Sequence, residues 1–201
     1  MSEVQTAQPA PPLPKRHNLF YTGDIYPQSV NNIRSACIQA LQQSASGIRL
    51  FLSSEGGQLS PALSLYHFLR ALSIPLTTYN CGTVESAAVP IFMAGEARLA
   101  APSSWFLIHS FLGGFYANQA DAPRLSERNQ NLNRHAELYE KILEERMNRP
   151  DSKLHIYERC RGDLGALMIG PDTALDVGIL TGITPADGLI AADDANISIA
   201  P

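Results

Sequence analysis

The segment Gly82-Thr83-Val84-Glu85-Ser86-Ala87-Ala88-Val89-Pro90-Ile91-Phe92-Met93-Ala94-Gly95 is followed, after a short polar break, by Ser104-Trp105-Phe106-Leu107-Ile108-His109-Ser110-Phe111-Leu112-Gly113-Gly114. Ser86 stands after a glycine-bearing turn at the start of a helix of small residues, and His109 ends an apolar run typical of a strand. A hydroxyl, an imidazole and glycine backbone that a substrate can approach closely are the groups that acyl transfer needs. The two segments therefore predict a site that pairs the Ser86 hydroxyl with the His109 imidazole.

The composition is typical of one soluble domain. The chain has 201 residues, of which 45% are apolar, so it can bury one good core. A net charge of −4 without a dense Lys/Arg run argues against a nucleic-acid partner. The apolar runs are too short to span a membrane, and the start lacks the charged-then-apolar pattern of a signal peptide. We therefore expect a cytoplasmic protein without a membrane partner.

The cysteines indicate neither a disulfide framework nor a metal site. Cys37, Cys81 and Cys160 are widely spaced, and no CxxC pair occurs. This usage fits a reducing compartment. We expect no metal and no cofactor.

Both ends of the chain differ in composition from its middle. Residues 1–16 contain four prolines and end in Lys15-Arg16, which is typical of a disordered arm. Residues 191–201 begin with Ala-Ala-Asp-Asp and are predicted to form a flexible tail. The folded domain is expected to span residues 17–190.

Strand and helix patterns alternate through the first half of the chain. Strands are predicted at residues 18–22, 48–52 and 76–80, and helices at 29–43, from Ser60 to Arg70, and after Ser86. Units of about thirty residues with this alternation imply right-handed βαβ crossovers, a mostly parallel sheet and hence an α/β fold. Because sites gather at the carboxyl ends of such strands, Gly56-Gly57 and Ser86 are expected to face each other.

One long helical pattern runs from residue 121 to residue 148. Pro123 lies in its first turn and Pro150 lies just beyond its end. A helix of roughly 25 residues is about 38 Å long, which is longer than most of a domain of this size. It either crosses the core of its own domain or projects to meet another subunit, and the pattern alone does not choose. Its apolar stripe consists of Leu132, Ala136, Tyr139, Leu143 and Met147.

In their order and spacing, these motifs resemble the proteolytic subunit of the Clp protease. The resemblance rests on Ser54-Glu55-Gly56-Gly57, on Gly82 and Ser86 ahead of Met93-Ala94-Gly95, and on Ile108-His109 with Leu112-Gly113-Gly114. It continues through the long helix, Ile156-Tyr157-Glu158-Arg159 and residues 174–178, and covers about residues 18–184.

The resemblance implies a crotonase-like α/β fold with a long projecting helix. It implies a serine endopeptidase with a Ser-His-Asp triad. It also implies a homo-oligomer of stacked heptameric rings, which enclose a chamber where polypeptide substrates are cut. An ATP-driven unfoldase of the AAA+ class would feed that chamber.

Carried over residue by residue, the resemblance makes Ser86 the nucleophile and His109 the base. It places the oxyanion donors at the backbone N–H groups of Gly57 and Ala87. A backbone donor does not depend on its side chain, so alanine at position 87 is compatible with this role. The family carries an aspartate after the Glu-Arg pair. Asp163 is the preferred match, and Asp172, after Pro171, is the competitor.

Several residues around the site depart from the family's pattern. Glu55 stands where a proline usually precedes the double glycine, Glu85 precedes the serine, and Ala88 and Pro90 occupy the helix that follows. A carboxylate at position 85 would occlude the substrate if it faced the serine. These departures keep two alternatives open: a ring subunit that is catalytically weak or inactive, and a crotonase-fold enzyme that acts on an acyl thioester.

Overall fold

The computed structural model describes residues 15–111, 122–147 and 154–199. Residues 1–14 of the predicted N-terminal arm lie outside the described residues, as do Leu112-Gly113-Gly114 and the expected helix end at Pro150. The first described strand already begins at Arg16, one residue before the predicted start of the domain.

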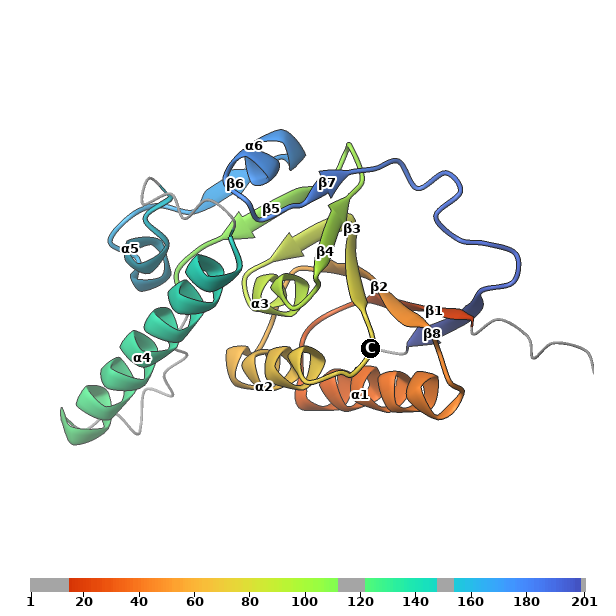
Figure 1. Cartoon of the computed structure of the whole chain (residues 1–201). Helices are drawn as coiled ribbons and strands as arrows, with labels where there is room; N and C mark the ends of the chain where they lie inside the picture. Colours follow the sequence, from red (N-terminus) through yellow and green to blue (C-terminus); the bar gives the residue numbers. More distant parts are fainter. Residues whose placement is uncertain (1–14, 112–121, 148–153, 200–201) are drawn as a thin grey trace, which may run out of the picture.

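Among the described residues, eight strands form one sheet (Figure 1). The main path runs in the order β6-β5-β3-β2-β1-β8, and β4 and β7 branch from β3. The pairs are parallel except for β5 with β6, so the predicted α/β fold with a mostly parallel sheet is confirmed. The strands are β1 (Arg16–Thr22), β2 (Gly47–Ser54), β3 (Leu76–Glu85), β4 (Ala97–Ala100), β5 (Trp105–Ile108), β6 (Leu167–Ile169), β7 (Gly182–Ile183) and β8 (Ala195–Ile199).

Helices α1 (Pro27–Gln42) and α2 (Leu59–Arg70) lie side by side below the sheet, with α3 (Ala88–Met93) next to α2 (Figure 1). The apolar positions of α1, such as Val30, Ile33 and Cys37, recur at helical spacing and are buried. They pack with Leu19 and Leu50, the inward residues of β1 and β2, in one continuous core. Burial of this amphipathic face is the main force that holds the helices on the sheet.

Strand β3 changes partner along its length, and this change brings the candidate serine to the edge of the core. Its first half, Thr77 to Asn80, pairs with β4, whereas Thr83 to Glu85 pair with β5. The Asn80 side chain holds the branch point, because its amide donates to the Trp105 carbonyl at 2.9 Å and its oxygen accepts from the Gly82 N–H at 3.0 Å. The carboxyl end of β3 therefore emerges beside β5, and His109 is the first residue after β5.

The long helix α4 (Ala122–Arg146) confirms the predicted helix, and its two halves lie in different environments. Its second half packs into the core of its own domain, where Tyr139 and Leu143 are at most 1% exposed. Its first half extends away from the sheet (Figure 1), and Leu125 there is 41% exposed. Two shorter helices follow it, α5 (Ile156–Arg161) and α6 (Pro171–Asp176).

The segment expected to form a flexible tail contains a strand, which corrects that expectation. Strand β8 pairs with β1 from His17–Ala195 to Tyr21–Ile199 and closes that edge of the sheet. The Asn18 amide donates to Asp194 and to Asn196, at 3.0 Å each. Arg49 lies 4.0 Å from the Asp194 carboxylate, with both side chains less than 10% exposed. These polar contacts hold β8 in the sheet, although the composition of residues 191–201 indicated a flexible tail.

Candidate active site

Ser86 occupies a sharp turn between β3 and α3. Its φ is +49°, a left-handed conformation that residues with a side chain seldom adopt. Its N–H donates to the Leu107 carbonyl of β5 at 2.8 Å, which holds the turn against the neighbouring strand. Such strained residues gather at functional sites, where the surrounding structure holds them in place. Ser86 is 8% exposed and lines a cavity.

The double glycine Gly56-Gly57 follows β2 and packs directly against the Ser86 turn. A Cβ at Gly56 would lie 2.8 Å from the Cβ of Ser86 and 3.1 Å from the Ala87 nitrogen, and its φ is +100°. A Cβ at Gly57 would lie 2.4 Å from the Ile25 carbonyl oxygen, and its φ is +141°. Neither position can therefore carry a side chain without displacing backbone. The loop and the turn that carry the predicted donors, Gly57 and Ala87, are packed together.

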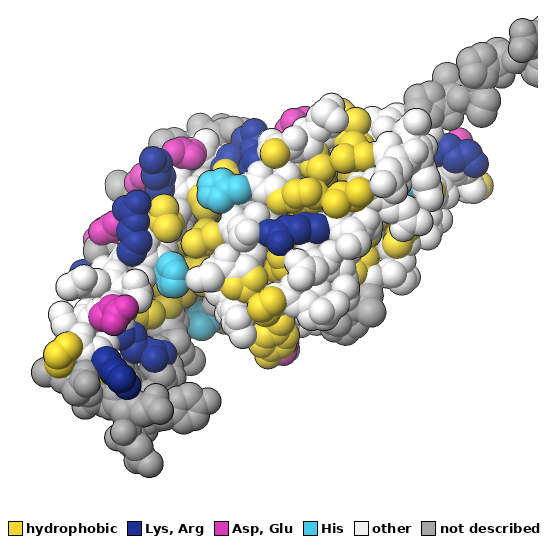
Figure 2. Space-filling model, turned by 90° about the horizontal axis from the view of Figure 1, so that it is seen from below, with side chains coloured by type: hydrophobic (Ala, Val, Ile, Leu, Met, Phe, Trp, Pro, Cys, Tyr) yellow, Lys and Arg dark blue, Asp and Glu magenta, His cyan; other side chains and the backbone are white. Residues whose placement is uncertain are grey.

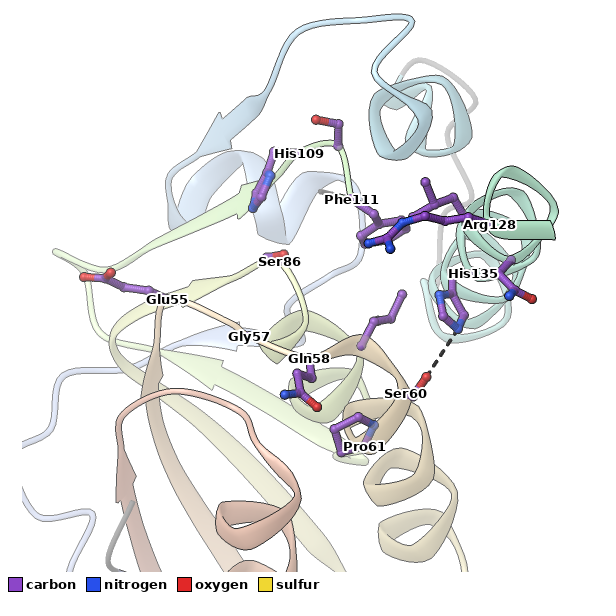
Figure 3. Close-up of a pocket in the computed structure, with 14 residues that line it drawn as sticks. Glu55, Gly57, Gln58, Ser60, Pro61, Ser86, His109, Phe111, Arg128 and His135 are labelled. Atoms are coloured by element: carbon purple, nitrogen blue, oxygen red, sulfur yellow. Dashed lines mark hydrogen bonds between the residues drawn. The ribbon is translucent and has the colours of Figure 1, made fainter. Parts of the chain in front are cut away.

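A cavity of about 580 Å³ connects the turn after β2, the end of β3, the segment after β5 and helix α4. Ser86, His109 and Gly57 all line it, as expected for strands that end at one edge of a parallel sheet. In Figure 3, His109 lies across the cavity from Gly57, and Ser86 lies between them. Both predicted reactive side chains and one predicted donor residue therefore share one cavity.

A tyrosine from α4 completes the backbone hydrogen bonding of the Ser86 turn. In a regular helix the N–H of residue 90 would donate to the carbonyl of residue 86, but Pro90 has no N–H. The buried hydroxyl of Tyr139 donates to the Ser86 carbonyl at 3.2 Å instead, beside the Val89 N–H at 3.1 Å. Helix α4 thus holds the Ser86 turn through a hydrogen bond from the Tyr139 side chain to the Ser86 backbone carbonyl.

Glu85, which could have occluded the site, is held elsewhere. Its carboxylate accepts hydrogen bonds from the Thr83 hydroxyl at 2.6 Å and from the Trp105 indole N–H at 3.2 Å. These partners lie along β3 and β5, and Glu85 does not line the cavity among the described residues. The departure at position 85 therefore puts no carboxylate into the described lining of the cavity.

Neither candidate triad acid lines the cavity among the described residues. The Asp163 carboxylate is exposed and lies 3.3 Å from the Arg161 guanidinium. Asp172 is exposed in the first turn of α6. The segment that carries Asp163 nevertheless lies beside the residue after His109, because a Cβ at Gly162 would be 3.4 Å from the Cβ of Ser110.

The cysteines offer no competing nucleophile. Burial raises the pKa of the Cys37 and Cys160 thiols to about 12, so both are protonated at neutral pH. Burial also raises the pKa of Cys81. No group of three or more His, Cys, Asp or Glu side chains is arranged to hold a metal ion in the described parts of the chain.

Sequence reasoning missed the contribution of α4 to the cavity. Arg128, Asn131, Leu132 and His135 all line it. Their spacing of three and four residues places them on one helix face, a signal that the sequence does carry. What the sequence could not show is that this face turns toward Ser86. His135 Nε2 lies 3.4 Å from the Ser60 hydroxyl, a contact that links α4 to α2.

The comparisons with known proteins agree with this geometry. The model of the Clp protease family matches residues 3–184. The chain belongs to the Clp protease family. Its fold is shared with a ClpP1 mutant from Listeria monocytogenes, with a TM-score of 0.72 at 17% identity over 85% of this chain and 92% of that one. At that identity the likeness shows the Clp-protease fold and nothing finer.

Two curated relatives carry the family name. The ATP-dependent Clp protease proteolytic subunit 3 of Rhizobium meliloti is 29% identical over 126 residues, which cover 60% of this chain and 65% of that protein. The proteolytic subunit 1 of Rhodopirellula baltica is 27% identical over 106 residues, which cover 51% of this chain and 47% of that protein. The chain thus spans about two thirds and about half of the lengths of these relatives.

Proposed function

We propose that this Clp-family chain is a serine endopeptidase that hydrolyses peptide bonds in unfolded polypeptides. One observation carries the proposal: Ser86, in a strained turn, lines the same cavity as His109 and the close-packed Gly57. A hydroxyl, an imidazole and close-packed backbone donors at one cavity are the groups that nucleophilic acyl transfer uses. The family match over residues 3–184 supports the same chemistry.

In the proposed mechanism, the Ser86 hydroxyl oxygen attacks the carbonyl carbon of the peptide bond. His109 takes the hydroxyl proton, and the N–H groups of Gly57 and Ala87 donate to the carbonyl oxygen as it becomes negative. The C–N bond then breaks, and His109 passes its proton to the leaving amine. Water then attacks the carbonyl carbon of the Ser86 ester and gives a proton to His109. His109 returns this proton to the Ser86 oxygen as the ester bond breaks and the acid leaves.

We retain Asp163 as the proposed triad acid, with Asp172 as the competitor. The closeness of Gly162 to Ser110 supports Asp163, because it brings the segment that carries Asp163 next to the residue after His109. Asp163→Asn should then lower kcat sharply while the protein stays folded, because the histidine loses the group that orients it. Asp172→Asn should have little effect on kcat. The opposite result would assign the acid to Asp172.

The nucleophile is tested with a fluorophosphonate probe and a fluorogenic peptide. Wild type should be labelled and active, whereas Ser86→Ala should lose labelling and several orders of magnitude in rate. Ser44→Ala is the matched control, because Ser44 also has a positive φ, +57°, but lies outside the cavity lining. Peptidase activity that persists in Ser86→Ala would refute the mechanism. A wild-type protein that is never labelled would favour the inactive ring subunit, and thioesterase activity without peptidase activity would favour the acyl-thioester alternative.

We further propose that the chain assembles into rings that enclose the site and receive substrate from an ATP-driven unfoldase, in the cytoplasm. The family match and the projecting first half of α4 support assembly. In the described residues no helix is long and apolar enough to cross a bilayer. Homo-oligomeric stacked heptameric rings are the specific form that we expect.

A further inference from the structure

Glu55 stands at one end of the cavity, immediately before the double glycine. It is exposed, and it is the one carboxylate among the described residues that line the cavity. In Figure 3 helix α4 lies on one side of Ser86 and Glu55 lies on the other. A glutamate here departs from the family's pattern, in which a proline usually precedes the double glycine. This end of the cavity therefore carries a negative charge that the usual family residue would not supply.

The backbone that carries Glu55 is fixed on both sides. The Gly56 N–H donates to the Ser54 hydroxyl at 3.1 Å, and the Gly56 carbonyl accepts from the Ile25 N–H at 2.7 Å. The Gln58 N–H in turn donates to the Ile25 carbonyl at 2.8 Å. The loop cannot move away from the cavity without breaking these hydrogen bonds. The Glu55 carboxylate therefore stays within reach of a substrate that is bound in the cavity.

No described residue neutralises the Glu55 carboxylate. Within the described part of the chain it makes no hydrogen bond, ion pair or other electrostatic contact. Glu85 differs in this respect, because its carboxylate accepts hydrogen bonds from the Thr83 hydroxyl at 2.6 Å and from the Trp105 indole N–H at 3.2 Å. Of these two carboxylates, Glu55 is thus the one that can pair with a substrate.

The two ends of the cavity suit the two halves of a peptide substrate differently. One end lies between α2 and α4, where Leu59, Leu132 and Phe111 offer apolar surface. The acyl half of the substrate stays on Ser86 until water releases it, so it needs the end where two helices hold its side chain. The amine half leaves after the first step, so it suits the end where Glu55 is exposed to solvent. The residue after the scissile bond would therefore lie toward Glu55.

We propose that Glu55 selects substrates with lysine or arginine directly after the scissile bond, so that the released half begins with a basic residue. This proposal rests on the proposed peptidase function and names the substrate class of that site. The Glu55 carboxylate accepts hydrogen bonds from the ammonium or guanidinium group of that residue, and the opposite charges attract. A glutamate at the same position of the substrate is repelled. Glu55 determines specificity and takes no part in the proton transfers between Ser86 and His109.

The test uses internally quenched peptides that span the scissile bond and differ only in the residue after it: Lys, Gln or Glu. Wild type should show the highest kcat/KM for Lys and the lowest for Glu, and mass spectrometry of the products confirms which bond is cut. Glu55→Gln should lower the Lys-to-Gln ratio of kcat/KM roughly fivefold, the upper range for an ion pair open to solvent. Glu55→Lys should reverse the order, so that the Glu peptide is cut faster than the Lys peptide.

Glu85→Gln is the matched control, because it removes the same charge from a residue beside Ser86 that does not line the cavity among the described residues. Its Lys-to-Gln ratio should equal that of wild type. Added salt should bring the wild-type ratio toward that of Glu55→Gln, since salt screens exposed charges. A ratio that Glu55→Gln leaves unchanged, or that Glu85→Gln lowers equally, would overturn the proposal. A parallel set of peptides, varied in the residue before the scissile bond, tests the assigned side, and a change confined to that set would also overturn it.

A binding measurement separates this proposal from the peptidase proposal. Fluorescein-labelled forms of the same peptides are titrated with full-length Ser86→Ala protein, and fluorescence polarisation is measured. Tighter binding of the Lys peptide than of the Gln peptide, lost when Glu55→Gln is added but kept when Glu85→Gln is added, supports the proposal even if wild type cuts no peptide. Equal binding of the Lys and Glu peptides by Ser86→Ala would overturn it even if wild type is an active peptidase.

Discussion

At the scale of single residues, the backbone carbonyl of Ser86 joins the Ser86 turn to helix α4. The conformation of Ser86 is strained, and Pro90 removes the helical N–H that would otherwise bind its carbonyl. Tyr139 supplies the missing donor from another element. Pro90 and Tyr139 therefore complement each other: the proline cannot donate to the Ser86 carbonyl, and the tyrosine hydroxyl donates in its place. Because they lie 49 residues apart in the sequence, only the structure connects them.

We predict that Tyr139→Phe lowers kcat and leaves KM nearly unchanged, because the Ser86 turn loses one of the bonds that hold it. The free energy of unfolding should fall by about 1 kcal/mol, the usual net worth of one hydrogen bond. Peptide hydrolysis and urea unfolding measure the two effects. Tyr79→Phe is the control, since Tyr79 is equally buried and its hydroxyl donates to the Thr184 carbonyl at 2.9 Å, away from the cavity.

A second substitution tests whether Tyr139 acts through its hydrogen bond to the Ser86 carbonyl. Pro90→Ala in the Tyr139→Phe background restores an N–H at the position from which a helix donates to the Ser86 carbonyl. We expect kcat to recover in the double variant. A double variant that stays as slow as Tyr139→Phe would show that the tyrosine acts through packing, for example on Phe111, and not through this carbonyl.

At the scale of secondary-structure elements, the strands and helices with a clear hydrophobic periodicity were predicted from the sequence. Strand β8, which long-range polar contacts hold in the sheet, was missed. The βαβ units, the long helix and the convergence of Ser86 with His109 follow from alternating patterns and from the geometry of parallel sheets. The start of the C-terminal segment was misleading, because Asp193 and Asp194 are typical of a solvated tail. The alternation in Asn196-Ile197-Ser198-Ile199 was the available strand signal.

The docking of β8 depends on Asp194, so we predict that Asp194→Ala lowers the free energy of unfolding by about 2 kcal/mol. The variant removes the acceptor of the Asn18 amide and the carboxylate near Arg49. Thermal and urea unfolding measure the change. Asp193→Ala is the control, because Asp193 is the exposed neighbour of Asp194. Equal stability of both variants and wild type would mean that β8 is held by its backbone alone.

The pKa of the Asp194 carboxylate predicts that the stability contributed by this residue depends on pH in the acid range. Burial raises the pKa of Asp194, but hydrogen bonds from the Ala191 N–H and the Asn18 amide, with the charge of Arg49, leave it below its ordinary value of 3.8. A lowered pKa in the folded state stabilises the fold above pH 3.8, and this contribution is lost as the pH falls through the folded-state value. The difference in stability between wild type and Asp194→Ala should therefore shrink in that range.

At the scale of the whole molecule, the burial of the α4 side chains bears on the two roles that the sequence left open for this helix. The stripe of α4 was expected either to cross its own core or to meet another subunit. Ala136, Tyr139, Leu143 and Met147 are buried within the subunit, so they contribute to its own core. What remains for a partner is the first half of α4. Figure 2 shows charged side chains of both signs gathered at the end of the molecule that α4 forms.

Assembly should therefore depend on Leu125 and not on Leu143. Leu125→Glu places a charge on a side chain that is 41% exposed, so the subunit should stay folded while its oligomers dissociate. Leu143→Glu buries a carboxylate in the core and should cost at least about 3 kcal/mol of unfolding free energy. Sedimentation velocity gives the assembly state, and urea unfolding gives the subunit stability. Leu175→Glu is the control, because Leu175 is similarly exposed, at 38%, but lies on α6.

Wild type and Leu175→Glu should sediment at many times the 21.8 kDa of one chain, and Leu125→Glu should sediment as smaller species. Peptidase activity should fall with Leu125→Glu, because Arg128 and Leu132 of the same helix line the cavity. In the proposed assembly, the neighbouring subunit would restrain this half of the helix. If wild type sediments as a compact monomer at micromolar concentration and still cuts peptides, the assembly proposal is wrong. The first half of α4 would then serve only to line the cavity of its own subunit.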